Sequence, residues 1–180
     1  MKNAAGPKVA AFLESVRIAT RLIKPPYFCI PLHGLAEQKY RERVYCYELY
    51  HQLRCCTRQD VWCVLSGAKT QLPLPIFRRL FNRTMPDFLL HVPSEMGANV
   101  VVMNINPITA RSQDIERDVK ALKRFTTARA SSRQAICLIY GDGESLDQFL
   151  SRMREAVFAK ESLIVMWHRH PGESADVVRV

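Results

Sequence analysis

The chain has 180 residues, 48% of them hydrophobic and 24% charged, which fits one globular domain and excludes a disordered or fibrous protein. Its net charge is +9, and the excess lies wholly in residues 1–83, which hold 14 Lys and Arg against 5 Asp and Glu, while residues 84–180 hold 12 of each sign. Because no apolar run approaches the roughly 18 residues that cross a bilayer and no secretory signal is present, we expect a cytoplasmic protein without a membrane partner.

Residues 1–36 are expected to form an N-terminal helix and a proline-rich connection that pack on the core. Apolar residues recur at helical spacing over 8–23, and the pair Pro25-Pro26 ends that helix. The stretch 25–34 is expected to be a loop. A second helix is predicted over 37–54. Its buried stripe consists of Cys46, Leu49, Tyr50 and Leu53.

The rest of the chain alternates between short strands and helices. A first strand is predicted over 61–65, and a third over 99–105, where a continuous Val and Met run is typical of a strand buried on both faces. The other predicted strands cover 87–92, 135–140 and 162–167, and the predicted helices cover 113–125 and 144–160. Residues 171–180 are expected to be a C-terminal tail. This order predicts an α/β fold in which helices flank a mixed central sheet of about five strands.

Two short segments resemble a known nuclease motif. Pro86-Asp87 opens the second predicted strand, and the run 99–103 is similar to the phrase that precedes the catalytic triplet of the PD-(D/E)XK superfamily. The helix over 114–125 and the strand over 136–140 also come where that superfamily has them. The chain therefore resembles the PD-(D/E)XK nucleases over about residues 40–167.

The resemblance implies a restriction-endonuclease-like core over 37–170 and a metal-dependent phosphodiesterase. In such an enzyme carboxylates hold Mg²⁺, which stabilises developing charge and acidifies a water, while a lysine orients that water. The resemblance gives the role of carboxylate ligand to Asp87 and to the helical Glu48. Where the superfamily has (D/E)-X-K, however, this sequence reads Asn104-Ile105-Asn106.

The altered triplet lowers the expected activity. Asn104 offers a neutral carbonyl oxygen in place of a carboxylate, and Asn106 cannot replace an ammonium group. The expected metal ligands are Asp87, Asn104 and Glu48, which should bind Mg²⁺ weakly if at all. A catalytic lysine could have migrated to Lys69 or Lys120, and Glu95 is a spare carboxylate. The candidate catalytic residues are thus Glu48, Asp87, Asn104, Asn106 and Lys69.

Basic residues in the first half of the chain offer a second route to function. They are Arg41, Arg43, Arg54, Arg58, Arg78, Arg79 and Arg83. Some bracket the helix that carries Glu48 and others lead into Asp87, so we expect a positively charged groove around the altered site. The expected partner is nucleic acid, DNA rather than RNA, and a homodimer is left open.

Three further groups of residues are less informative. The cysteine cluster consists of Cys46, Cys55, Cys56 and Cys63. Its spacing favours reduced thiols, with a zinc site as the open alternative. His168-Arg169-His170 is expected to form an exposed edge, and Gly141-Asp142-Gly143 to form a turn.

Three functions remain open at this point. The first is a nuclease-like domain with a degraded metal site that binds nucleic acid or assists DNA processing or defence. The second is an active Mg²⁺-dependent DNA endonuclease whose catalytic residues have migrated. The third is a structural or protein-interaction module, in which Asp87 braces a strand and Glu48 lies on a solvated helix face.

Overall fold

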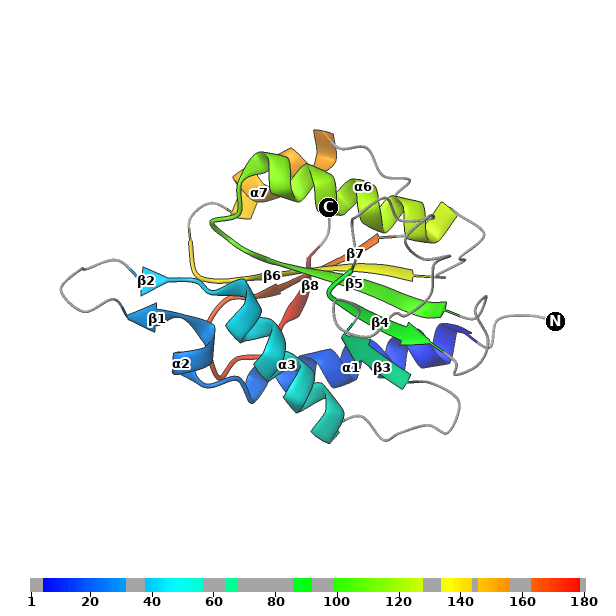
Figure 1. The fold of residues 1–180 in the computed structure, drawn as a ribbon, viewed down its shortest axis with the longest axis horizontal. Coiled ribbons are helices and arrows are strands. Elements are labelled where there is room, and N and C mark those ends of the chain that lie inside the picture. Colours follow the sequence, from blue (N-terminus) through cyan, green and yellow to red (C-terminus); the bar gives the residue numbers. More distant parts are fainter. Residues whose placement is uncertain are drawn as a thin grey trace.

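A mixed β-sheet forms the centre of the molecule (Figure 1). The computed structural model describes residues 5–31, 38–56, 64–67, 86–91, 99–127, 134–143, 146–155 and 163–178. In this part of the chain the sheet has six strands in the order β3-β4-β5-β6-β7-β8. These are β3 (Val64–Gly67), β4 (Phe88–His91), β5 (Asn99–Pro107), β6 (Gln134–Tyr140), β7 (Leu163–His168) and β8 (Asp176–Val178). The predicted α/β class with a mixed sheet is confirmed.

The direction of each strand follows from its connection. β4 pairs antiparallel with β3 and β5, whereas β5, β6 and β7 run parallel to one another. Parallel neighbours need a crossover, and α6 (Ser112–Thr127) and α7 (Leu146–Glu155) lie within the two crossovers. The first strand of the sheet differs from the prediction of 61–65, because β3 extends two residues further, through Ser66 and Gly67.

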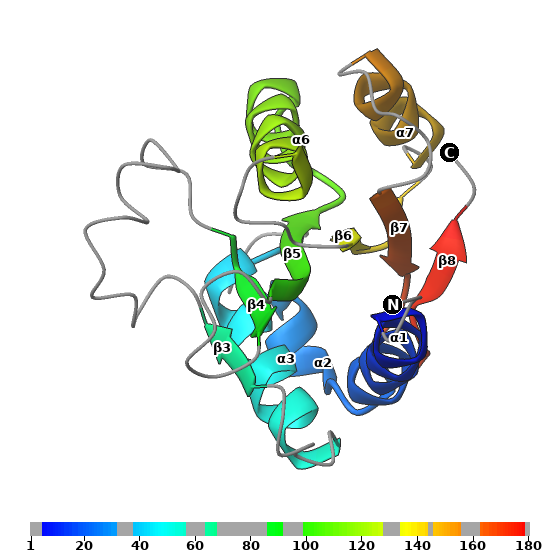
Figure 2. The same cartoon turned by 90° about the vertical axis from the view of Figure 1, so that its right-hand side faces the viewer.

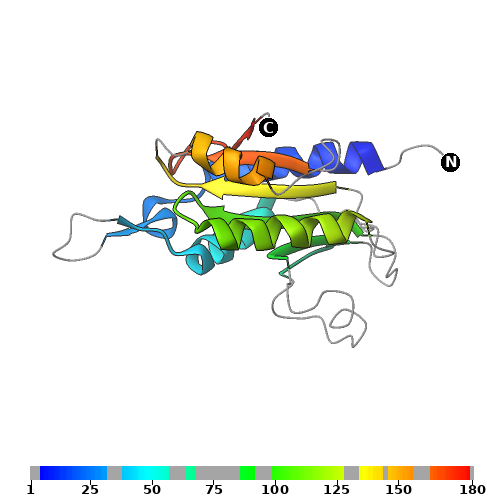
Figure 3. The same ribbon diagram turned by 90° about the horizontal axis from the view of Figure 1, so that it is seen from above.

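Helices cover both faces of the sheet. α1 (Ala5–Arg21), α2 (Pro25–Phe28) and α3 (Glu42–Cys56) lie on one face, which we call the α1–α3 layer (Figure 2). α6 and α7 lie side by side on the other face, which we call the α6–α7 layer (Figure 3). A two-stranded sheet of β1 (Ile30–Pro31) and β2 (Gln38–Lys39) stands apart from the main sheet. Among the described helices, none has the length and apolar character needed to cross a membrane.

Two segments depart from the prediction. The stretch expected to be a loop contains α2, because proline suits the first turn of a helix, where its missing N–H is not needed. The segment expected to be a C-terminal tail contains β8, which pairs antiparallel with β7 and raises the strand number from about five to six. The N–H of Ala175, just before β8, donates to Thr20 Oγ1 of α1 at 2.9 Å.

The central strand β5 is buried on both of its faces. Val101, Met103 and Ile105 belong to the apolar cluster that includes α1 and α3, whereas Val102 belongs to the cluster that includes α6. Because side chains alternate along a strand, Asn104 and Asn106 point toward the α6–α7 layer. Each is only 2% exposed. The continuous Val and Met run therefore carries two polar side chains into the core.

Candidate functional site

Asp87 and Asn104 lie opposite each other where β4 begins. The register pairs Phe88 with Met103, which places the preceding residue Asp87 across from Asn104. The N–H of Asp87 donates to the Met103 carbonyl at 3.1 Å, and the N–H of Ile105 donates to Asp87 Oδ2 at 2.9 Å. The structure thus brings together two of the residues that the sequence singled out. The Asp87 carboxylate, which is buried, also braces the backbone of β5.

The two asparagines are buried with part of their hydrogen-bonding capacity unused. Asn104 Oδ1 and Asn106 Nδ2 have no hydrogen-bond partner in the described structure. A buried polar atom without a partner lowers the stability of the fold by about 1–3 kcal/mol. These two side chains are therefore not explained by core packing alone. They are neutral, and they stand at the two triplet positions where the resemblance expects a carboxylate and an ammonium group.

Cys137 and Asp118 belong to the same region, and the sequence reasoning missed both. Cys137 pairs with Asn104 across β5 and β6 and is buried. Burial raises the pKa of the Cys137 thiol to about 12, and the nearby carboxylates of Asp118 and Asp87 add to that rise. The Asn106 side chain offsets part of it. The spacing of Asp118 from Ile115, three residues, is the sequence signal that could have placed it beside the buried stripe of α6. In the structure only 16% of its side chain is exposed.

Glu48 makes its described contacts within α3. It accepts a hydrogen bond from Gln52 at 2.7 Å, and one of its oxygens lies 3.7 Å from His51 Nδ1. α3 packs on the far face of the sheet, where Tyr50 stacks on Phe88 with ring centroids 6.0 Å apart. Asp87, adjacent to Phe88, points to the opposite face, as its proximity to Cys137 also indicates. Glu48 is therefore not brought to the Asp87–Asn104 pair.

These side chains do not fit a Mg²⁺ site. Mg²⁺ takes an octahedral set of oxygen ligands and usually relies on one or two carboxylates. Asp87 Oδ2 is already bonded to the backbone, Asn104 is neutral, and Glu48 lies in the other layer. Within the described residues, no group of three or more His, Cys, Asp or Glu side chains is arranged to hold a metal ion. We therefore derive no hydrolytic step through a metal here.

The other sequence-predicted residues are placed as follows. Lys120 is exposed on α6 and pairs with Glu116 at 3.4 Å, so it does not reach toward Asp87. Lys69 and Glu95 lie outside the described residues, as do Arg58, Arg78, Arg79, Arg83 and Cys63. Arg41, Arg43 and Arg54 are exposed at or on α3. They lie in the layer opposite to the Asn104 side chain rather than around it. Cys46, Cys55 and Cys56 form no disulfide with a described residue.

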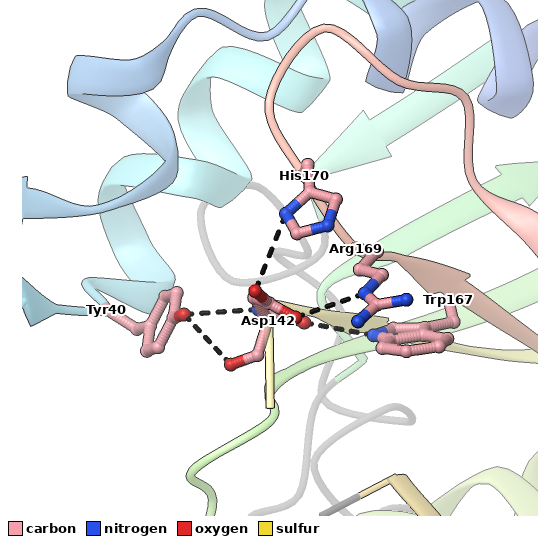
Figure 4. Close-up of polar contacts among 6 residues, drawn as sticks. Tyr40, Asp142, Trp167, Arg169 and His170 are labelled. Carbon is pink, nitrogen blue, oxygen red and sulfur yellow. Dashed lines mark hydrogen bonds and ion pairs between the residues drawn. The ribbon is translucent and has the colours of Figure 1, made fainter. Parts of the chain in front are cut away.

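A polar corner lies at the carboxyl ends of β6 and β7 (Figure 4). The Asp142 carboxylate accepts a hydrogen bond from Arg169 Nε at 3.1 Å and lies 3.8 Å from His170 Nδ1. The Asp142 N–H donates a hydrogen bond to the Tyr40 hydroxyl at 3.2 Å. The Trp167 indole donates to the Gly141 carbonyl at 3.0 Å. The Arg169 guanidinium also covers the Trp167 ring at 5.3 Å. These contacts tie three separate segments together at one end of the sheet.

His168 is not exposed, contrary to the prediction for this segment. Its Nδ1 shares a hydrogen bond of 2.7 Å with the Tyr45 hydroxyl, and its ring lies edge-on to Phe28. Burial lowers the pKa of His168 to about 4, although the backbone carbonyls of His170 and Glu173 favour its charged form. The imidazole is therefore neutral at physiological pH. His168 is the last residue of a buried strand, and it supports the core rather than a surface site.

Comparison with protein-family models and with curated proteins gave no match for this chain.

Proposed function

We propose that this chain is a restriction-endonuclease-like domain with a degraded metal site, which binds nucleic acid in support of DNA processing or defence. The observation that carries the proposal is the Asp87–Asn104 pair. It lies where the resemblance to PD-(D/E)XK nucleases predicts two metal-binding side chains, but only Asp87 is charged, and its Oδ2 is bonded to the backbone. Asn106, where a lysine is expected, is a neutral amide in the core.

Binding without cleavage is the activity that these residues favour. Hydrolysis of a phosphodiester by this route needs a tightly held cation and a polarised water, and a single engaged carboxylate supports neither well. Binding needs only positive charge that reaches phosphates, which the net charge of +9 and the exposed Arg41, Arg43 and Arg54 favour. We propose DNA rather than RNA as the partner.

We place the protein in the cytoplasm, where thiols remain reduced. This is in keeping with the lack of a disulfide among the described cysteines. We further propose a homodimer, because a two-fold axis would match the symmetry of a DNA duplex. Light scattering during size-exclusion chromatography tests this point, and a mass of 20.7 kDa, that of one chain, would contradict it.

The test of the proposed function combines binding and cleavage. Duplex DNA should bind at low salt and dissociate steeply as NaCl rises, and plasmid should stay intact with Mg²⁺ or Mn²⁺. Cleavage that disappears in Asp87→Ala would instead establish an active nuclease. If duplex and single-stranded DNA and RNA all fail to bind at low salt, the chain is a structural or protein-interaction module.

A further inference from the structure

One exposed side of α3 carries residues that neither the core nor the Asp87–Asn104 pair uses. They are Arg43, Tyr47, His51 and Arg54, which we call the α3 stripe. Spacings of four, four and three residues place them along one side of the helix. All four are exposed, with 62% of Tyr47 and 64% of the His51 side chain accessible. The opposite side of α3 carries the buried residues Tyr45, Leu49 and Leu53.

Positive charge on the α3 stripe is not neutralised by its described neighbours. In the described parts of the chain, Arg43 and Arg54 form no ion pair. His51 lies 3.7 Å from Glu48, but the Glu48 side chain is only 12% exposed and is also bonded by Gln52. The stripe therefore presents to solvent two guanidinium groups that pair with no described carboxylate, an imidazole and a phenol.

The α6–α7 layer presents a different surface. On α6, the carboxylates of Asp114 and Glu116 are nearly half exposed, and they lie 3.1 Å from Arg117 and 3.4 Å from Lys120. This contrast is independent of the net charge of the chain, because it compares two faces of one molecule. A polyanion is repelled by exposed carboxylates, and Glu48, beside the α3 stripe, has a side chain that is only 12% exposed.

We propose that the α3 stripe is the surface on which this protein docks duplex nucleic acid, on the face of the molecule opposite to the side chains of Asp87 and Asn104. The inference rests on the proposed function and adds a location and a binding mode to it. The degraded site then lies behind the sheet and does not contact the duplex. This would explain how DNA binding survives the loss of the metal ligands.

The spacing of the stripe favours a duplex. Arg43 and Arg54 are about 16 Å apart along the helix axis, at about 1.5 Å per residue. The major groove of B-DNA is about 12 Å wide, so a helix lying across it could place the two guanidinium groups on the phosphates of opposite walls. Tyr47 and His51 would then lie between the two walls, over the groove. Contacts of this kind position a protein on DNA and depend strongly on salt.

The test compares two double variants that remove equal charge from the two helix layers. Arg43→Gln with Arg54→Gln alters the α3 stripe, while Arg111→Gln with Arg124→Gln alters exposed arginines beside and on α6. Fluorescence anisotropy with a labelled duplex of about 20 base pairs gives the affinity between roughly 50 and 200 mM NaCl. Thermal melting of each variant verifies that the fold is unchanged.

The α3 variant should bind at least tenfold more weakly at low salt. Its slope of log affinity against log salt should be smaller by about 2, since each lost phosphate contact removes about 0.9. The α6 variant should stay within about threefold of the wild type. Equal losses in both variants, no loss in the α3 variant, or tighter binding of a single strand than of a duplex would overturn this docking surface. If the wild type binds no nucleic acid at all, the proposed function itself fails.

Discussion

Asp87 has a structural use that does not depend on catalysis. Its carboxylate accepts the Ile105 N–H inside the sheet, so a change at this position would affect the fold even in a protein without nuclease activity. Loss of cleavage in an Asp87 variant is therefore informative only when the variant is shown to be folded. Asn104 and Asn106, by contrast, carry unpartnered buried atoms, and their replacement tests the site more directly.

Asp87→Ala should lower the free energy of unfolding by about 1–3 kcal/mol, because the buried Ile105 N–H loses its acceptor. Asp87→Asn should cost less, since an amide oxygen can still accept that hydrogen bond. Urea unfolding measures both variants, with Glu173→Ala at an exposed carboxylate as the control. A loss in Asp87→Ala no larger than in the control would show that the Asp87–Ile105 hydrogen bond does not brace β5.

Introducing the (D/E)-X-K triplet into β5 should create a response to metal if the proposed resemblance holds. The double variant Asn104→Asp with Asn106→Lys should unfold at a lower temperature than the wild type without metal, because it buries two charges. Mg²⁺ should recover part of that loss, since a second carboxylate would stand beside Asp87. Melting curves with and without Mg²⁺ provide the measurement. A wild type that melts higher in Mg²⁺ would contradict the description of its site as degraded.

At the scale of whole elements, the turn after β6 has a tightly constrained backbone. Gly141 has a φ of +118°, and a Cβ there would lie 2.8 Å from Ile108 Cγ2 and 2.9 Å from the Tyr40 ring. The glycine therefore allows Tyr40 to pack against the turn and to bond with Asp142, which joins the segment before α3 to the end of β6.

Gly141→Ala should destabilise the protein by about 2 kcal/mol or more, from backbone strain together with the steric overlap. Gly172→Ala is the matched control, because Gly172 has a φ of +85° but nothing within 4 Å of a Cβ. Gly172→Ala should lower the free energy of unfolding by a smaller amount, because only the strain of the left-handed backbone remains. Chemical unfolding of the two variants side by side makes the comparison, and equal losses would show that packing against Tyr40 contributes nothing.

Elements with a strong repeating pattern were predictable from the sequence. The helix predicted over 113–125 is α6, and the Val and Met run is β5, because period and burial agree at these places. β8 was missed because its three residues are too few to show a pattern, and pairing with β7 forms it. α2 was missed because Pro25-Pro26 marks a helix end and a helix start equally well.

The candidate site was only partly predictable, for a related reason. Asp87 and Asn104 stand next to each other in the register of β4 and β5, which follow each other along the chain, so a motif in the sequence could anticipate the pair. Glu48 and Asp118 depend on how helices are distributed between the two faces of the sheet. The sequence carries no local signal for that choice, so Glu48 was expected at the pair and Asp118 was missed.

At the scale of the whole molecule, His168 makes stability depend on pH. Its pKa falls from 6.5 to about 4 on folding, mainly because it is buried, so the unfolded chain takes up a proton first as pH falls. Above about pH 6.5 the free energy of unfolding does not depend on this group. As pH falls from 6.5 toward 4, the free energy of unfolding decreases progressively, by at most about 3 kcal/mol. Urea unfolding at several pH values should show this loss, and His168→Gln should remove most of it. An unchanged pH dependence in that variant would contradict the assignment.

The order of strands in the sheet is also their order along the chain, from β3 to β8. A growing sheet can therefore add one strand at a time as the polypeptide leaves the ribosome. The helix α1 does not follow this stepwise order. It is made first, but its buried residues, such as Phe12 and Ile23, share a cluster with β5, β6 and β7. Because α1 also packs on α3, a nascent chain can cover part of the apolar face of α1 early, and the rest stays uncovered until the last third is made. Products of interrupted translation would expose that helix, which marks them for chaperones and proteases.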